Sequence, residues 1–367
     1  MAAAPPIRLA DYTSWAFELS TIHLNVDVRD TFVLIKARME LQPRSASQPL
    51  ALRGVDLELL SVSIDGRDLP TTAYNCSEGW LTIDQPPGQT FVLETCCRID
   101  PYNNSSLEGL YASGGMLSTQ CEAEGFRRIT FHPDRPDVLS RWTVRIEAAR
   151  ASCPVLLSNG NAIAMEELPD GRHAVTWEDP FPKPSYLFAL VAGELREIRD
   201  QFTTASGRKV TLRLHVEEGD EPYTSHAMES LKRSMAWDEE IYGLEYDLDE
   251  YNIVAVRHFN MGAMENKSLN IFNSKLVLAD AETATDGELE RIESVIAHEY
   301  FHNWSGNRIT CRDWFQLSLK EGLTVFRDQS FTADLHSAAV KRIEDVAMLR
   351  NTQFREDAGP TAHPVKP

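Results

Sequence analysis

Hydrophobic and polar residues alternate along several segments in the first half of the chain. In residues 20–28, Ile22, Leu24 and Val26 alternate with polar residues, which is the period of a strand with one buried face. The same period recurs in residues 59–66, 90–99 and 141–148. Asp65-Gly66 adds the sequence of a tight hairpin turn. We therefore expect an antiparallel β-sandwich or saddle up to about residue 190.

The second half of the chain mixes helical and strand periods. Apolar residues recur at helical spacing from Tyr223 to Tyr242, and Gly243 is a suitable stop. Residues 251–256 and 269–278 are instead rich in apolar residues without helical spacing, which indicates buried strands. Three prolines in residues 179–195 indicate a hinge between the two halves. The chain is thus expected to be multidomain, with a β-rich domain over residues 1–193 and an α+β domain over residues 194–367.

Composition and charge exclude some classes of partner. The 367 residues include 36 basic and 55 acidic side chains, a net charge of −19, whereas nucleic acids and anionic membranes are bound by cationic surfaces. No apolar run is long enough to cross a bilayer, and the alanine-proline start at residues 1–6 does not resemble a signal peptide. The six cysteines form no C-x-x-C pair. We therefore expect a cytoplasmic protein with reduced thiols.

The segment AHEYFHNW, residues 297–304, has the spacing of a metal site. Thr285 and Glu288 form a candidate capping box that begins a helix, and Ser305-Gly306-Asn307 is expected to end it. Four residues correspond to about 400° of helical rotation, so His298 and His302 project from the same face, one turn apart. Two imidazoles placed in this way can bind one zinc ion, and Glu299 lies beside them as a candidate base.

A catalytic zinc ion needs a third protein ligand, and Glu321 is the candidate. It lies in a second helical pattern over residues 313–329, and 18 residues separate it from His302. This separation allows a loop and a helix that returns antiparallel to the first. The alternative is an ordinary solvated carboxylate, but the histidine pair upstream favours a ligand. Seven further histidines lack comparable partners: His23, His132, His173, His226, His258, His336 and His363.

The pattern HEYFH, followed after 18 residues by Glu321, resembles the gluzincin metallopeptidases, and a second motif narrows the resemblance. Residues 262–266, GAMEN, resemble the exopeptidase signature of the M1 aminopeptidases. Further similar stretches are residues 119–126, 134–141, 179–184 and 311–329. The resemblance covers nearly the whole chain. It implies a β-rich saddle domain followed by a thermolysin-like catalytic domain.

The resemblance also implies a set of functional residues. One zinc ion would be bound by His298, His302 and Glu321, and Glu299 would take a proton from zinc-bound water. The amino terminus of a peptide would be held by carboxylates. The residues implied in substrate binding are Gln120, Glu122, Met261, Gly262, Ala263, Met264, Glu265 and Asn266. The substrates would be peptides with free amino termini, with alanine, arginine or lysine preferred as first residue, and the protein a monomer.

The sequence departs from the family pattern at two places. Ser268 stands where relatives commonly have glycine, so the turn there is expected to differ. The segment with the family's oxyanion-binding tyrosine does not occur, so the catalytic domain is expected to be incomplete.

Three alternatives stay open. An endopeptidase would not need Glu122 and Glu265. An epoxide hydrolase of the same zinc class would carry a motif that resembles GGMEN, whereas this chain has GAMEN. An inactive or structural zinc-binding fragment would not need Glu299.

Overall fold

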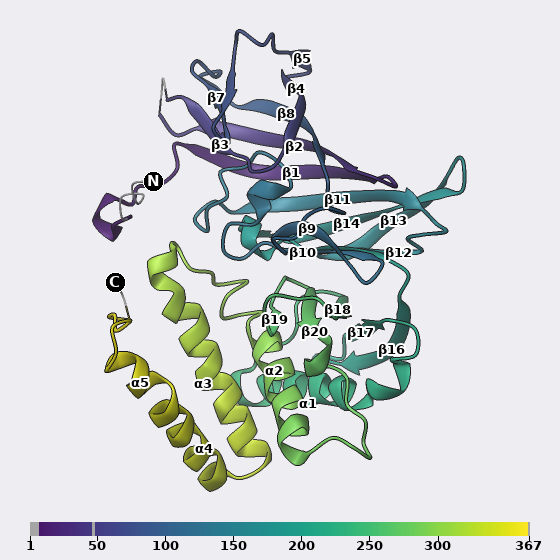
Figure 1. Ribbon diagram of the computed structural model, residues 1–367, viewed down its shortest axis with the longest axis vertical. Coiled ribbons are helices and arrows are strands. Elements are labelled where there is room, and N and C mark those ends of the chain that lie inside the picture. Colours follow the sequence, from purple (N-terminus) through teal and green to yellow (C-terminus); the bar gives the residue numbers. More distant parts are fainter. Residues whose placement is uncertain (1–6, 46–47, 366–367) are drawn as a thin grey trace.

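The computed structural model describes residues 7–45 and 48–365. The alanine-proline start, residues 1–6, lies outside these ranges. Figure 1 shows a β-rich part above a part that mixes a sheet with helices, which confirms the predicted order of a β-rich and an α+β region. No helix in the described ranges is long and apolar enough to cross a membrane.

The largest sheet of the β-rich part has the strand order β13-β14-β11-β1-β2-β8-β4-β5. Its strands are β1 (Phe17–Val28), β2 (Val33–Pro43), β4 (Glu58–Ile64), β5 (Arg67–Asp68), β8 (Phe91–Ile99), β11 (Ser140–Ala149), β13 (Asn161–Leu168) and β14 (Arg172–Lys183). The burial of β1 alternates as the sequence predicted, and Asp65 and Gly66 turn between β4 and β5 with φ of 51° and 73°. The predicted hairpin is therefore confirmed.

One strand pair differs from the predicted antiparallel arrangement. β1 runs parallel to β11, with Thr21 opposite Arg141 and Asp27 opposite Glu147. Parallel neighbours need a long connection, and here residues 29–139 supply it. The alternation along each strand reports which face is buried but not the direction of its neighbour, so this pair could not be read from the sequence.

Two smaller sheets complete the β-rich part. One has the order β3-β7-β6, and the other has the order β12-β15-β10-β9. Their strands are β3 (Leu50–Arg53), β6 (Asn75–Ser77), β7 (Trp80–Ile83), β9 (Gly109–Ser113), β10 (Met116–Gln120), β12 (Val155–Ser158) and β15 (Leu190–Gly193). The strand β10 positions the first of the predicted site residues, because it ends at Gln120 and the chain continues directly to Glu122.

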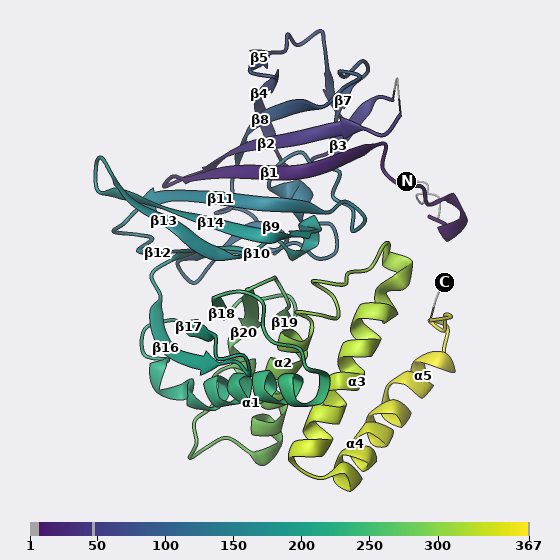
Figure 2. The same ribbon diagram turned by 180° about the vertical axis from the view of Figure 1, so that it is seen from behind.

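The second part contains a sheet of order β16-β17-β18-β20-β19 and the helices of the chain (Figures 1 and 2). Its elements are β16 (Arg196–Thr203), β17 (Lys209–Val216), α1 (Ser225–Tyr242), β18 (Glu250–Val256), β19 (Ala263–Met264), β20 (Leu269–Asn273), α2 (Asp286–Phe301), α3 (Leu317–Leu335), α4 (Ala338–Asn351) and α5 (Gln353–Asp357). The predicted helix before Gly243 is α1, and Gly243 ends it with φ of 66°. The strand predicted over residues 269–278 is shorter, because Asn273 caps a 3-10 helix over Ser274–Leu276.

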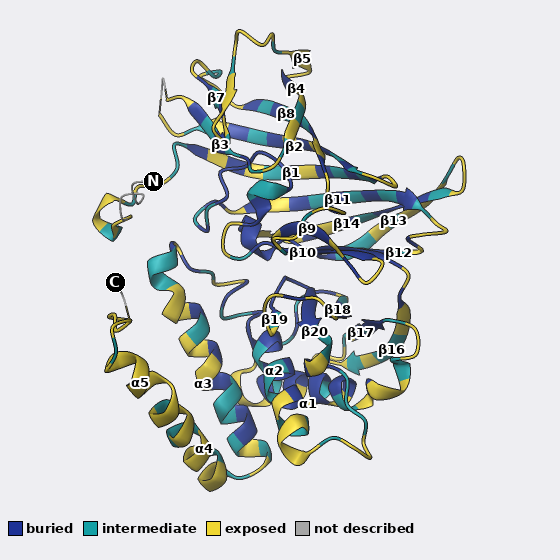
Figure 3. Cartoon of the chain, viewed as in Figure 1, coloured by how far each residue is buried: buried dark blue, intermediate teal, exposed yellow. Residues whose placement is uncertain are grey.

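The strand β18 is buried on both faces and joins the two parts. Val254 and Val256 pack in the core of the β-rich part, whereas Ile253 and Ala255 pack in the core beneath the helices. Successive side chains of a strand point to opposite faces, so this sheet lies between the β-rich part and the helices. In Figure 3, β10, β18 and β20 are almost wholly buried where the two parts meet. The division at residue 193 predicted from the sequence remains a prediction.

Candidate metal centre and substrate cleft

The last turn of α2 presents two histidines on one side of the helix. The helix begins at the predicted capping box, in which Thr285 Oγ1 accepts a hydrogen bond from the backbone N–H of Glu288. Ile296 packs in the core and fixes the rotation of the helix about its axis. As predicted from the spacing, the rings of His298 and His302 then face each other, and their Nε2 atoms lie 3.0 Å apart.

The end of this helix differs from the prediction. The sequence predicted a stop at residues 305–307, but α2 ends at Phe301 and His302 is its C-cap. The chain turns back at once, because the N–H of Asn307 donates to the carbonyl of His302 at 2.9 Å. Gly306 has a φ of 146°, and a Cβ there would lie 2.8 Å from His302 Nδ1. The glycine therefore permits the loop to pass against the imidazole ring.

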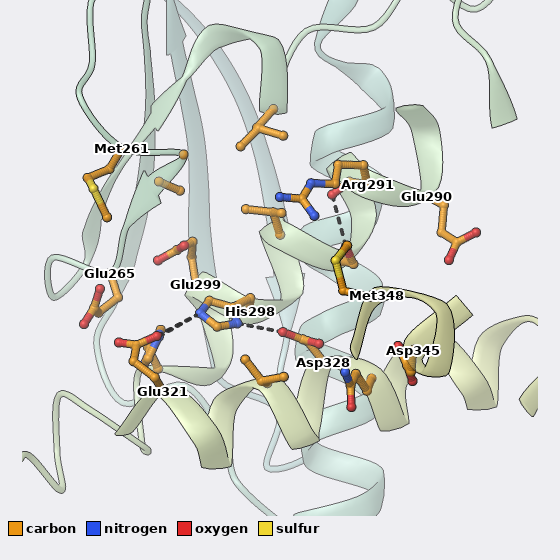
Figure 4. A pocket seen from close by; sticks show the side chains of 18 of the residues that line it. Met261, Glu265, Glu290, Arg291, His298, Glu299, Glu321, Asp328, Asp345 and Met348 are labelled. Atoms are coloured by element: carbon orange, nitrogen blue, oxygen red, sulfur yellow. Dashed lines mark hydrogen bonds and ion pairs between the residues drawn. The ribbon is translucent and has the colours of Figure 1, made fainter. Parts of the chain in front are cut away.

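The helix α3 places Glu321 opposite the two histidines, as predicted. Its Oε2 atom lies 3.5 Å from the Nε2 atom of His298 and 3.5 Å from that of His302. One ligand atom from each of the three residues fits within 4.8 Å of the others. Figure 4 shows the side chains of Glu321 and His298 turned toward each other from α3 and α2. These three residues form the candidate metal group.

The hydrogen-bond partners of the two Nδ1 atoms determine the tautomer of each histidine. His298 Nδ1 lies 2.6 Å from Asp328 Oδ2, and His302 Nδ1 lies 2.8 Å from the carbonyl oxygen of Ser305. A carboxylate and a carbonyl only accept, so both Nδ1 atoms carry hydrogen and neutral rings present a lone pair at Nε2. With Glu321, three acceptors then converge without a donor between them. This donor set fits a divalent metal ion.

The electrostatics of the candidate metal group favour positive charge. Burial lowers the pKa of His298, but the hydrogen bonds with Asp328 and Glu321 outweigh burial and raise this pKa to about 10. Burial raises the pKa of Glu321, but both histidines bring it well below its ordinary value. A proton occupies the group when no metal ion is bound. Metal binding therefore has to displace that proton.

Glu299 lies next to the candidate metal group in a place shielded from water. Its residue is 6% exposed, and within the described ranges its Oε2 atom has no hydrogen-bond partner. Burial raises the pKa of Glu299 to about 8, with His298 opposing and Glu265 adding to the increase. A carboxyl group that exchanges its proton near neutral pH is suited to general acid and base catalysis.

A second group of carboxylates lies next to the first. Glu122 follows β10 of the β-rich part, and Glu265 follows β19, the edge strand of the other sheet. Carboxylate oxygens of Glu122, Glu265 and Glu321 lie within 4.8 Å of one another. Burial, and then Glu265, raise the pKa of Glu122 to about 7 against the effect of Lys320. The structure thus brings the two predicted amino-terminus anchors to the candidate metal group.

Most of the remaining predicted residues line one cavity of about 1000 Å³. Gln120, Met261, Gly262 and Ala263 lie in its wall together with the residues described above. Two predicted side chains do not line it. Met264 packs in the core, and Asn266 is fully buried, so any contact of these two with a substrate has to come from the backbone.

Ser268 adopts the conformation that glycine favours. Its φ is 62°, and its Oγ atom accepts a hydrogen bond from the N–H of Gly160 at 2.6 Å. The turn thus includes a side-chain contact with Gly160, and the expected difference from relatives with glycine stays a prediction.

Two residues at the site were missed by reasoning from the sequence. Asp328 follows Glu321 by seven positions, which is about two helical turns and places both on one face, so helical spacing could have found it. Lys320 contacts Glu122, Glu265 and Glu321, but a lysine within a helix carries no sign of burial. Only the three-dimensional arrangement reveals it.

Comparison with known families assigns both parts of the chain to one family. The model described as "Peptidase M1 N-terminal domain" matches residues 16–187, and the model described as "Peptidase family M1 domain" matches residues 226–367. The two matches follow each other in the order of the two structural parts.

Individual relatives agree with this assignment. Aminopeptidase N of Caulobacter vibrioides is 58% identical over 98% of this chain and 42% of its own length. Aminopeptidase N of Escherichia coli is 57% identical over 97% of the chain and 41% of its length. Among solved structures, Legionella pneumophila aminopeptidase A in complex with aspartic acid has a TM-score of 0.89 and 38% identity, over 92% of this chain and 40% of that one. The chain thus spans about two fifths of the length of these relatives.

Proposed function

Because the chain belongs to the peptidase M1 family, we propose that it carries the zinc site and the amino-terminus anchor of an aminopeptidase. The relatives named above support this reaction class. One observation carries the proposal: the carboxylates of Glu122 and Glu265 lie within 4.8 Å of that of Glu321, a candidate metal ligand. A peptide whose ammonium group is held there has its first peptide bond near the metal.

The substrate is a peptide with a free amino terminus. Two carboxylates can hold an ammonium group through charge-assisted hydrogen bonds, and an acetylated terminus has no charge to offer them. The strand β19 is an edge strand that pairs with β20 on one side, with Ala263 opposite Phe272. Its other side can pair with an extended peptide as an added strand.

The hydrolysis itself needs a proton acceptor next to the peptide bond. When bound, zinc supplies Lewis-acid polarisation of the carbonyl and acidifies water. Glu299 accepts the proton of the attacking water at its carboxylate and later donates it to the leaving amine. His298 and His302 are held in the required tautomer by Asp328 and the Ser305 carbonyl, so their Nε2 atoms stay available.

Three further features belong to the proposal. One zinc ion binds per chain. Within the described ranges, only His298, His302 and Glu321 bring ring nitrogens of two histidines together with a carboxylate oxygen. Alanine, arginine and lysine are the preferred first residues, and the net charge of −19 is compatible with basic ones. The six cysteines are free thiols, in keeping with a cytoplasmic location.

The test combines zinc content with peptide hydrolysis. We expect about one zinc per purified chain by elemental analysis, and release of free amino acid from an unblocked peptide but not from its N-acetylated form. Glu299→Ala should keep the zinc and lose the activity, because the base is removed and the ligands stay. Glu229→Ala, an exposed carboxyl on α1, serves as the control. Equal cleavage of the acetylated peptide, or full activity in Glu299→Ala, would contradict the proposal.

A further inference from the structure

Lys320 is a buried cation surrounded by carboxylates at the site. Its side chain is 1% exposed, and its Nζ atom lies 2.9 Å from Glu122 Oε1 and 2.5 Å from Glu265 Oε1. The same atom also pairs with Glu321 Oε1. One ammonium group therefore contacts both predicted amino-terminus anchors and the predicted metal ligand that follows it in the chain.

The contacts of Lys320 all lie within the protein. A lysine ammonium group has three N–H bonds and no acceptor. Two of them are donated to Glu265 and Glu321. Glu122 adds an ion pair, and the ring of Tyr186 lies 5.5 Å from the Nζ atom on another side. Lys320 is thus surrounded by partners that belong to the protein itself.

The three carboxylates share Lys320 through one oxygen each. Glu321 gives its Oε1 atom to the lysine, while its Oε2 atom faces the two histidines. Both carboxylate oxygens of Glu321 are therefore fixed, one by the cation inside the protein and one by the metal group. Glu122 and Glu265 follow strands of different sheets, and Lys320 is a partner that they have in common.

We propose that Lys320 is a positioning residue that fixes the distance between the amino-terminus anchor and the metal ligand Glu321. By joining Glu122, Glu265 and Glu321, it determines how far from the metal an ammonium group is held, and so which peptide bond is presented. This inference rests on the proposed aminopeptidase function. It assigns Lys320 no contact with the reacting atoms.

The charges of the three glutamates and of Lys320 explain why the anchor attracts a cationic ligand. When all three are ionised, Glu122, Glu265 and Glu321 bring three negative charges, and Lys320 returns one positive charge. Without Lys320, three buried carboxylates would repel one another and separate or take up protons. With it, two negative charges remain in excess, and an ammonium group and a divalent metal ion are both attracted to them. The class of ligand expected at the anchor is therefore a primary ammonium group.

The test uses two metal-binding hydroxamates, of which only the first carries an amino group. Alanine hydroxamate offers a hydroxamate to the metal and an ammonium group to the anchor, whereas acetohydroxamate offers the hydroxamate alone. Dissociation constants are measured by calorimetry at saturating zinc for the unmodified chain and for Lys320→Met. A charge-assisted hydrogen-bond network contributes enough that alanine hydroxamate should bind roughly 10- to 100-fold more weakly to Lys320→Met. Acetohydroxamate should bind as before.

A matched control separates positioning from a general loss of stability. Lys183→Met removes another buried lysine, which pairs with Asp179 at 3.0 Å, and should leave both dissociation constants unchanged. Lys320→Gln is the second variant if Lys320→Met does not fold by circular dichroism.

Each outcome of the test has one meaning. If both hydroxamates weaken equally in the Lys320 variants, or neither weakens, Lys320 does not position the anchor and the inference is wrong. If the unmodified chain binds zinc but does not prefer alanine hydroxamate over acetohydroxamate, the proposed aminopeptidase function itself is contradicted.

Discussion

Among single residues, Asp328 offers a direct test of the candidate metal group. Its carboxylate accepts a hydrogen bond from His298 Nδ1, and this fixes which nitrogen of the ring faces the metal. Replacing such a partner of a ligating histidine typically lowers metal affinity about 10- to 100-fold. We expect a loss of this size in zinc affinity for Asp328→Ala, measured by competition with a chelator.

The control for this prediction lies on the same helix. Asp334→Ala removes a carboxylate of α3 that accepts a hydrogen bond from Trp237 Nε1 at 2.9 Å, away from the histidines. This variant should keep the zinc affinity of the unmodified chain. Equal affinity in Asp328→Ala and Asp334→Ala would show that the outer partner of His298 has no influence on the metal.

The positions of single site residues could be predicted from the sequence where their spacing along one helix decides the geometry. His298 and His302 lie on consecutive turns of one helix, so their convergence follows from the helical repeat. The place of Glu321 needed a second helix and a family resemblance. Lys320 could not be found, because its burial depends on Glu122, which lies 198 positions earlier in the chain, from 122 to 320.

Among the elements, α1 and α3 are joined by a buried ion pair. Arg327 donates to Asp238 Oδ1 and to the carbonyl of Phe301, so one guanidinium group connects α1, α2 and α3. The other oxygen of Asp238 has no partner within the described ranges. Burial raises the pKa of Asp238 to about 6, and Arg327 opposes this increase.

This pair predicts how stability depends on pH. The folded chain binds the proton of Asp238 more tightly than the unfolded chain, whose aspartate has its ordinary pKa near 4. The contribution of Asp238 to the free energy of unfolding is therefore present below about pH 4 and falls as the pH rises to about 6. Relative to Asp238→Asn, the unmodified chain should lose up to about 3 kcal/mol over this range, measured by urea unfolding. Parallel profiles for the two proteins would contradict the prediction.

Elements were predicted well where local sequence decides them. The capping box at Thr285 and the stop at Gly243 depend on residues within one turn, and both are confirmed. The end of α2 was predicted too late, because the contact of the loop with the His302 ring ends the helix before its sequence signal. The parallel pair of β1 and β11 depends on residues more than a hundred positions apart.

At the scale of the whole molecule, the last helices expose several large apolar side chains. Leu319, Leu323 and Phe326 recur at helical spacing on α3 and are 59%, 53% and 61% exposed. The neighbouring helix α4 has no buried residue and exposes Ile343 at 70%. Figures 1 and 2 show α3, α4 and α5 together along one side of the molecule. We refer to these four exposed apolar residues of α3 and α4 together as the outer helical face.

The outer helical face should make the isolated chain associate. Exposed apolar patches of neighbouring residues drive contacts between molecules, whereas the sequence had predicted a monomer. Sedimentation velocity should therefore show species larger than a monomer as the protein concentration increases. The double variant Leu323→Glu with Phe326→Glu should shift the chain toward monomer, whereas Leu60→Glu, at a single exposed leucine of β4, should not. A monomer at every concentration would contradict this prediction.

The pairing of β1 with β11 has a consequence for how the chain acquires its structure. Thr21 and Arg141 are neighbours across 120 positions, from 21 to 141, so β1 lacks this partner until most of the β-rich part has been synthesised. Contacts between such distant residues are slow to form, because a long loop must close first. Glu122 lies inside that loop. On the ribosome, one of the two carboxylates of the ammonium-binding site is therefore synthesised before β11, the parallel partner of β1, has emerged.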